Sequence, residues 1–309
     1  MVKGFIDTPV YKPLEATIFI AASDARPEVK ALADYVCTGV NDDAVISQAI
    51  SMLPASGGRI RLSEGNFVFG NTLVISRDNV SLEGSGPGTV IKGAISSDYI
   101  QVAPYHQYIK ISNLKIDGSS QTSGNGIYLY GTVGNPISRC IISDCWVYNV
   151  YGTGIMLTYN NGTIVSNNIV ESSRNGFAIG VWYGEGNTVI GNTCIASYHN
   201  AIDNETSNYN TIMGNVCVGN SGGGIWVSAS SNVVVSGNIM YNNSGAADVW
   251  VGNTGLTNII SSNIMTSGTT YSINEASGSD YNIFTNNHCI AGKIYTTGPN
   301  SIVANNIQL

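Results

Sequence analysis

The chain has 309 residues, of which only 11% are charged, and it contains 36 glycines and recurrent asparagines. Long helices need more Lys, Glu, Arg and Leu than this composition supplies, so strands and turns are expected. A formal net charge of −7, from 13 Lys and Arg against 20 Asp and Glu, provides no basic stripe for a phosphate backbone, so we expect no nucleic-acid partner.

Residues 1–40 are expected to form an N-terminal extension and the first strands. The opening segment MVKGFIDTPVYKPLEATIFIAAS has only a short apolar stretch after several charges and a proline, so no signal peptide is recognised. No segment of the chain approaches about 18 consecutive apolar residues, and insertion into a membrane is not expected.

Residues 41–56 are predicted to contain a capping helix. In NDDAVISQAISMLP (41–54), Asn41 or Asp42 can cap the first turn, apolar residues recur at helical spacing, and Pro54 ends the helix. The helix precedes the repeats described next. We therefore place it over the N-terminal end of residues 57–309, where it would cover apolar core and unpaired strand edges.

From about residue 100 onward, an Asn, or an Asp in its place, returns at a nearly constant interval. The steps are 31, 24, 24, 23, 23, 25 and 24 residues, through Asn113, Asp144, Asn168, Asn192, Asn215, Asn238, Asn263 and Asn287. Such a period indicates a solenoid, and stacked Asn side chains can bond to one another between coils. A leucine-rich repeat is excluded because the chain lacks the leucine scaffold of such repeats, and the high content of Gly and Asn excludes a helix in each unit.

The fold class that follows is all-β: one domain built as a single-stranded, right-handed parallel β-helix with ~22–25 residues per coil. The six cysteines lack CxxC spacing and are interpreted as small buried apolar residues, with a Cys140–Cys145 disulfide as the alternative.

A second motif, Gly-apolar-x-apolar, recurs half a period from the asparagines, and its alternation predicts strands with one inward and one outward face. The predicted inward positions are Ile127, Ile155, Phe177, Ile202, Ile225 and Val249. The predicted outward column comprises Tyr128, Met156, Ala178, Asp203, Trp226 and Trp250, and the column two residues further on comprises Tyr130, Thr158, Gly180, Glu205, Ser228 and Gly252.

Two parts of the sequence resemble the pectate-lyase-like superfamily, which includes phage tail-spike proteins. The segments GVNDDA (39–44), QAI (48–50) and GGRIRLSEGNF (57–67) resemble its entry segment, a capping helix followed by a first strand. The later NTVIGN and NGIYL turns resemble its β-helix repeats. The resemblance covers nearly the whole chain and implies the fold; the activities it implies range over lyases, hydrolases, epimerases and non-catalytic fibres.

These columns predict a polysaccharide-binding face with a carboxylate pair. Asp203 and Glu205 point outward from one strand, and Arg174 and His199 are expected to stack one coil apart beside them, because adjacent coils lie about 4.8 Å apart. Aromatic rings can stack on sugar C–H faces while carboxylates bond to hydroxyls. The expected substrate-binding residues are Tyr128, Tyr130, Tyr198, Trp182, Trp226 and Trp250, with the last two as a flat path and Trp182 as one wall.

Two reactions are open for this site. Glycoside hydrolysis would use Asp203 and Glu205 as the acid and the second carboxylate. Lyase or epimerase action on a uronic-acid polymer would use His199 or Tyr198 as a base, with Arg174 or a bound Ca²⁺ neutralising the substrate. The string 198–205 resembles the catalytic strand of alginate epimerases, but Glu205 stands where that family has histidine.

A third alternative is a non-catalytic fibre or adhesin whose aromatic face contacts a glycan or a trimer partner. In that case Asp203 and Glu205 are solvated charges, and Arg174 and His199 make a surface ion pair and a turn hydrogen bond. All three alternatives predict an extracellular or virion-associated protein, monomeric or homotrimeric, and only the lyase alternative calls for a cofactor.

Overall fold

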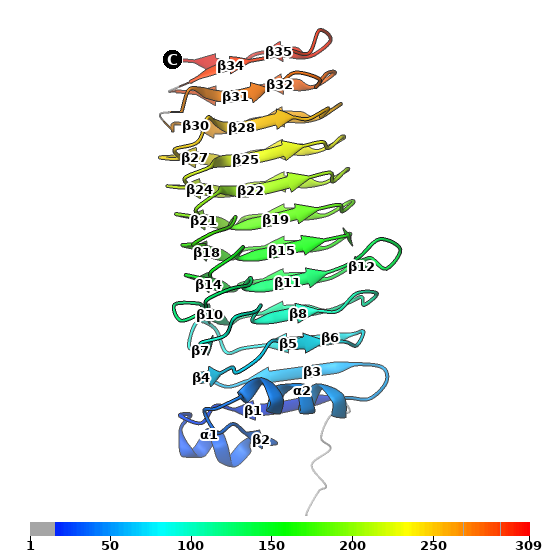
Figure 1. Cartoon of the computed structure of the whole chain (residues 1–309), viewed down its shortest axis with the longest axis vertical. Helices are drawn as coiled ribbons and strands as arrows, with labels where there is room; N and C mark the ends of the chain where they lie inside the picture. The colour runs from blue at the N-terminus through cyan, green and yellow to red at the C-terminus, as the bar shows by residue number, and fades with distance from the viewer. Residues whose placement is uncertain (1–15, 268, 291) are drawn as a thin grey trace, which may run out of the picture.

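The computed structural model describes residues 16–267, 269–290 and 292–309 and shows coils stacked along one axis, with helices at the N-terminal end (Figure 1). Each full coil contributes one strand to each of three parallel sheets, here named sheets A, B and C. This is the predicted parallel β-helix. Of the expected extension 1–40, residues 1–15 lie outside the described part.

Sheet A has 13 strands and holds the N-terminal pair at one end. In spatial order they are β2 (Tyr35–Val36), β1 (Thr17–Ala21), β3 (Gly58–Leu62), β6 (Val80–Glu83), β9 (Lys110–Ser112), β13 (Ile141–Ser143), β17 (Ile164–Ser166), β20 (Thr188–Ile190), β23 (Thr211–Met213), β26 (Val234–Ser236), β29 (Ile259–Ser261), β32 (Ile283–Thr285) and β35 (Ile302–Ala304).

Sheet B has 11 strands, and one further pair lies outside the three sheets. The strands of sheet B, from the N-terminal end, are β4 (Gly65–Val68), β7 (Thr89–Lys92), β10 (Lys115–Asp117), β14 (Trp146–Tyr148), β18 (Ile169–Glu171), β21 (Thr193–Ile195), β24 (Val216–Val218), β27 (Ile239–Tyr241), β30 (Ile264–Met265), β33 (His288–Cys289) and β36 (Ile307–Gln308). The separate pair is β12 (Ile137–Ser138) with β16 (Asn160–Asn161).

Sheet C has 10 strands and faces the viewer in Figure 1. From the N-terminal end they are β5 (Leu73–Ile75), β8 (Ile100–Val102), β11 (Ile127–Tyr130), β15 (Ile155–Thr158), β19 (Ile179–Trp182), β22 (Asn200–Glu205), β25 (Gly223–Ser228), β28 (Ala247–Gly252), β31 (Tyr271–Glu275) and β34 (Lys293–Tyr295). Its outer face carries the candidate site.

The inward column of sheet C is a stack of branched aliphatic side chains that are almost completely buried, which gives adjacent coils a continuous apolar core. Its members are Ile127, Ile155, Ile179, Ile202, Ile225, Val249 and Ile273. The predicted column is confirmed except at one coil.

The exception is Phe177, which was predicted to point inward but lies before β19, while Ile179 pairs with Ile155. Ile179 lies eight residues after Glu171, whereas Ile202 lies only seven after the equivalent residue, Ile195. The turn before β19 is therefore one residue longer than the next one. The longer turn contains the Gly-Phe motif, so the inward residue of β19 is Ile179, two residues after the predicted Phe177.

The predicted asparagine ladder lies buried at the turn between sheets A and B. Each Nδ2 group donates to the Oδ1 atom of the next coil at 3.0 Å, through Asn168, Asn192, Asn215, Asn238, Asn263, Asn287 and Asn306. Asn113 and Asp144 were wrongly included. They adopt left-handed backbone conformations (φ 56° and 57°), and Cys145 occupies the ladder position, its backbone N–H donating to Asn168.

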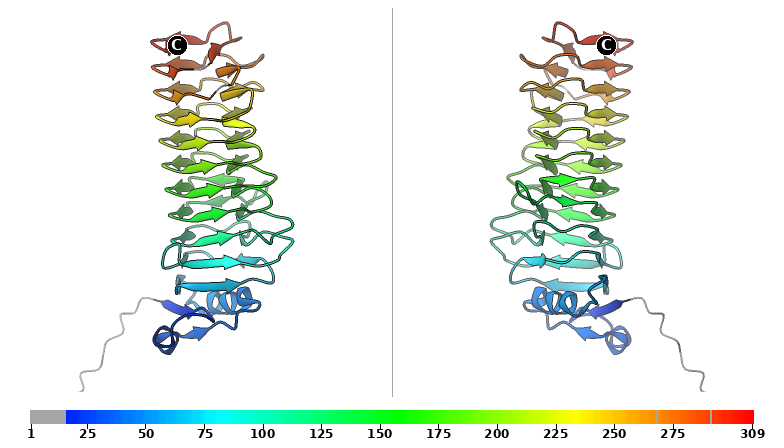
Figure 2. Two further views of the ribbon diagram at one scale, coloured as in Figure 1. Left: turned by 90° about the vertical axis from the view of Figure 1, so that its left-hand side faces the viewer. Right: turned by 90° about the vertical axis from the view of Figure 1, so that its right-hand side faces the viewer.

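Helix α2 (Asp42–Met52) covers the N-terminal end of the stack, as predicted (Figure 2). Asn41 makes no capping bond with its side chain; instead the Asp42 carboxylate accepts bonds from the backbone of Gly39 and Val68 at 3.0 and 2.8 Å. Asn41 therefore occupies the predicted N-cap position but does not cap the helix through its side chain, and the Asp42 carboxylate ties the helix to Val68 of sheet B. A short helix, α1 (Pro27–Leu32), was not predicted.

The six cysteines are buried and free, which confirms their interpretation as small apolar residues and contradicts the alternative Cys140–Cys145 disulfide. Within the described ranges, no helix has the length and apolar character needed to cross a membrane.

Candidate functional site

The two carboxylates of β22 occupy neighbouring columns on the outer face of sheet C. Asp203 pairs with Gly180 on one side and Trp226 on the other, while Glu205 pairs with Trp182 and Ser228. The two acids therefore lie one strand alternation apart and project to the same side, as predicted.

Asp203 is only 5% exposed even though it points out of the coil. Trp182 donates its indole Nε1–H to Oδ2 at 2.7 Å, and Asn200 donates Nδ2–H to Oδ1 at 3.3 Å. Burial raises the pKa of Asp203 to about 6; the bond from Trp182 opposes this rise, and the negative charge of Glu205 adds to it. The carboxyl group can therefore hold a proton in mildly acidic solution.

A cavity of about 370 Å³ opens beside these acids. It is lined by Phe177, His199, Asn200, Asp203, Glu205, Gly222, Trp226, Ser228, Trp250 and Asn253. The structure thus brings together five of the predicted site residues: both acids, His199 and two tryptophans. The cavity combines aromatic walls with several hydrogen-bonding groups, a composition suited to a sugar.

Trp226 and Trp250 form one wall of the cavity. Their ring centroids are 4.7 Å apart with an interplanar angle of 83°, so the rings meet edge to face and do not form the flat path that was predicted. The Trp250 ring lies over Gly252, where an added Cβ would be 2.1 Å from its Cη2 atom. The indole nitrogen of Trp226 is buried and has no hydrogen-bond partner among the described residues.

Trp182 contributes more directly than the sequence suggested. It was expected in a segment after the strand, but it is the last residue of β19 and shares a column with Glu205. The longer turn before β19 explains the change. At Gly180, the residue paired with Asp203, an added Cβ would be only 2.6 Å from the sulfur of Met156, so the Met156 side chain occupies the space that a larger residue would need there.

Arg174 does not line the cavity. Its guanidinium donates to the backbone carbonyls of Gly118 and Gln121 and lies 5.7 Å from the ring of Tyr151. These carbonyls belong to an earlier coil, so they draw the side chain away from Asp203. The predicted stacking of Arg174 beside the acids was wrong, and none of the described residues that line the cavity is a lysine or an arginine.

His199 lies at the cavity, with its ring centroid 5.4 Å from Phe177 and 4.9 Å from Tyr198. Tyr198 is 56% exposed and lies outside the lining. Tyr128 and Tyr130 pack against each other at 5.3 Å on the same face. Both are three coils away from the carboxylates, about 14 Å along the stack, and do not line the cavity.

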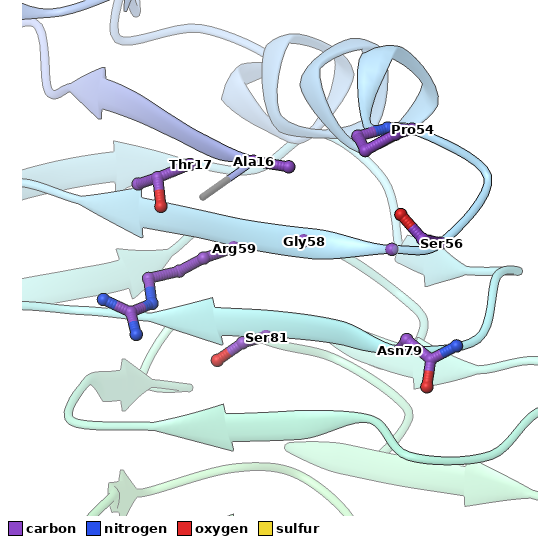
Figure 3. Close-up of a pocket in the computed structure, with 9 residues that line it drawn as sticks. Ala16, Thr17, Pro54, Ser56, Gly58, Arg59, Asn79 and Ser81 are labelled. Atoms are coloured by element: carbon purple, nitrogen blue, oxygen red, sulfur yellow. The ribbon is translucent and has the colours of Figure 1, made fainter. Parts of the chain in front are cut away.

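Another hollow, of about 390 Å³, lies beside the N-terminal cap. Figure 3 shows Thr17, Pro54 and Arg59 around it, with Ser81 on β6 and Asn79 directly before that strand. Among residues 16 and onward that line it, only Arg59 is charged, and its guanidinium lies 3.6 Å from the carboxylate of Glu83. It therefore lacks the paired acids and aromatic walls of the cavity on sheet C.

Across the described residues, no three His, Cys, Asp or Glu side chains converge as they would around a metal ion.

The coils are similar to solved structures with low sequence identity. The endo-xylogalacturonan hydrolase of Aspergillus tubingensis matches with 13% identity and a TM-score of 0.72, over 95% of this chain and 93% of that one. The alginate lyase of Paenibacillus sp. matches with 15% identity and a TM-score of 0.68, over 94% and 99%. A tailspike protein of an Escherichia coli O157:H7 bacteriophage matches with 13% identity and a TM-score of 0.60, over 85% and 38%.

At these identities the similarity establishes the fold alone. No curated protein matches the sequence at a significant level. A family profile described as "Right handed beta helix region" matches residues 100–287, which is more than half of the chain and includes the whole candidate site. The resemblance inferred from the repeats is therefore confirmed for the fold, and the chain belongs to the right-handed β-helix family.

Proposed function

We propose that this protein is a polysaccharide-degrading glycoside hydrolase that acts outside the cell or on a virion. The observation that carries the proposal is the state of Asp203: an outward carboxyl group, 5% exposed, whose pKa is raised to about 6 beside a second acid at the wall of an aromatic cavity. A glycosidase needs one carboxyl group that retains its proton and a second one nearby that is ionised.

Asp203 would be the general acid. In its protonated form it can donate to the glycosidic oxygen as the bond to the leaving group breaks, and the Trp182 N–H stabilises the carboxylate that results. Glu205 is the less buried of the pair and would either activate a water molecule or attack the sugar carbon.

The lining of the cavity supports a neutral glycan as the substrate. Phe177, Trp226 and Trp250 offer ring surfaces, while Asn200 and Ser228 offer hydrogen-bonding groups. The described part of the lining has two acids and no lysine or arginine, so a uronate carboxylate would be repelled unless a cation accompanied it. The hydrolase in the comparison shows that this fold can support glycan hydrolysis.

Lyase or epimerase action is a second candidate, favoured by the position of His199 at the cavity and by the similarity to an alginate lyase. His199 or Tyr198 would then remove the proton beside the uronate carboxyl group. Arg174 cannot neutralise the substrate from its present position, so this reaction would depend on a bound cation such as Ca²⁺.

A panel of neutral and acidic polysaccharides tests the proposal, with wild type, Asp203→Asn, Glu205→Gln and, as a control, Glu28→Gln on exposed helix α1. New reducing ends without absorbance of an unsaturated uronate indicate hydrolysis, and that absorbance indicates a lyase. We expect each site variant to lose on the order of 10²–10⁴-fold in rate while the control is unaffected. Full activity in both site variants would refute the assignment, and binding without any product would favour the fibre.

A further inference from the structure

A second cavity lies at the end of β15 and β19, on the side where the chain leaves sheet C. Its volume is about 330 Å³, and it is lined by Thr132, Val133, Gly134, Pro136, Tyr159, Asn161, Tyr183 and Glu185. None of these residues lines the cavity at Asp203.

One wall of this cavity is an inserted loop, residues 131–136, that projects from the stack beside β12 (Figure 1). Tyr128 and Met156 are paired but 28 residues apart, whereas the next pair in the column, Met156 and Gly180, is 24 apart. The backbones of Thr132 and Asn135 exchange two hydrogen bonds, of 3.2 and 3.0 Å. The loop is therefore a closed hairpin that can form a defined wall.

The opposite wall is a pair of stacked tyrosines. The Tyr159 and Tyr183 rings have centroids 4.9 Å apart and planes inclined by 14°, and Tyr183 is 45% exposed. Glu185 is also exposed, and the Asn161 side-chain oxygen accepts a bond from its backbone at 3.2 Å. Aromatic rings beside a carboxylate and amides can contact both the C–H faces and the hydroxyls of a sugar.

This cavity lies close to the one at Asp203 along the chain and along the stack. Tyr183 directly follows Trp182, which bonds to Asp203 and pairs with Glu205. The tyrosine pair belongs to the two coils that precede β22, so it lies about 5–10 Å along the stack from the carboxylates. A glycan that passes Trp182 can therefore reach both cavities at once.

We propose that the cavity between loop 131–136 and the Tyr159–Tyr183 pair is a distal subsite that binds further residues of the same neutral glycan. The inference rests on the proposed function for the substrate class. The subsite contributes affinity away from the bond that is cleaved, because it lacks a pair of acids: among the described residues that line it, only Glu185 is charged. Charge therefore disfavours a uronate here as well.

Binding without turnover tests the subsite. The full chain carrying Asp203→Asn is run in native gels that contain inulin, arabinoxylan, galactomannan, dextran or alginate, and retardation gives an affinity for each. Adding Tyr183→Ala should lower the affinity for the polysaccharide that retards the Asp203→Asn protein by about three- to tenfold, since it removes an aromatic contact. Tyr183→Phe keeps the ring and should restore most of the retention.

Tyr209→Ala is the matched control, because Tyr209 is 62% exposed and, like Tyr183, has a left-handed backbone conformation (φ 56° and 58°). It lines neither cavity and should leave retention unchanged. Equal retention with and without Tyr183→Ala would overturn the subsite, as would the absence of retardation in every gel. If wild type releases no product while the Tyr183 effect persists, the hydrolase proposal fails and the subsite stands.

Discussion

Asp248 places a carboxyl group inside the stack, and its ionisation should lower the stability of the protein at neutral pH. The residue lies in β28 with no exposed surface, and its Oδ1 atom accepts a bond from Asn243 at 3.3 Å. Its Oδ2 atom is also buried. Burial raises the pKa of Asp248 to about 6, against the 3.8 of an exposed aspartate.

The sign follows from this direction. Because the folded-state pKa is above the unfolded one, the protonated form is favoured by folding; its contribution is fully present below about pH 3.8 and is lost as the pH rises through about 6. A difference of about two pKa units lowers the free energy of unfolding by about 3 kcal/mol between pH 3.5 and pH 8.

Asp248→Ala removes the titration without leaving Asn243 unpaired, since its Nδ2 group also donates to the Cys217 carbonyl at 3.1 Å and to Ser267 Oγ at 3.2 Å. The loss of packing is the same at every pH. We therefore expect the free energy of unfolding of the variant, relative to that of wild type, to rise by about 3 kcal/mol between pH 3.5 and pH 8. This rise corresponds to about 5 °C in Tm for a chain of this size.

Thermal melts of both proteins across this pH range provide the measurement, and the quantity of interest is the difference in Tm between variant and wild type at each pH. Other acids titrate in both proteins and cancel in this difference. If the difference is the same at pH 3.5 and pH 8, then Asp248 does not carry a raised pKa in the folded protein and the argument from burial is refuted.

Three further outcomes are expected. Trp182→Phe removes the hydrogen bond that stabilises the Asp203 carboxylate, so the pKa of Asp203 should rise. The rate of hydrolysis falls tenfold per pH unit above this pKa, which is about 6 in wild type, so the alkaline limb of the pH–rate profile should move to higher pH. An unchanged profile would contradict the role of the indole. Gly252→Ala places a methyl group 2.1 Å from the Trp250 indole and so displaces this ring. The variant should bind the glycan more weakly in the native gels and lose no more than a few degrees in Tm. Unchanged retention would show that the Trp250 ring does not contact the glycan. Ile202→Asp buries a charge in the core and should abolish cooperative melting, whereas Ile190→Asp, on an outer face and 37% exposed, should melt close to wild type; similar melts for both would contradict the inward assignment.

The sequence predicted the solenoid and five of the ten residues that line the cavity at Asp203, because periodicity carries that information directly. The ladder from Asn168 to Asn287 and the inward isoleucines are local patterns that repeat, and they place Asp203, Glu205 and Trp226 in register without any knowledge of tertiary contacts. The same logic placed helix α2 at the open N-terminal end.

The remainder depends on features that a repeating pattern does not encode. One extra residue between Glu171 and Ile179 moved Trp182 into the site, and a second Gly-apolar pair at 176–177 concealed the shift. Arg174 points away because two backbone carbonyls 53 and 56 residues earlier in the chain accept its hydrogen bonds. Such partners belong to another coil and become visible only when the coils are stacked.

The longer turn before β19 also indicates how a solenoid can acquire a new surface. A single residue inserted at a turn leaves the inward contacts in place, since Ile179 still pairs with Ile155 and Ile202. It nevertheless changes which side chains the coil presents on its outer face. Recognition by such a protein can thus change through small insertions at the corners, while the hydrophobic interior is inherited intact.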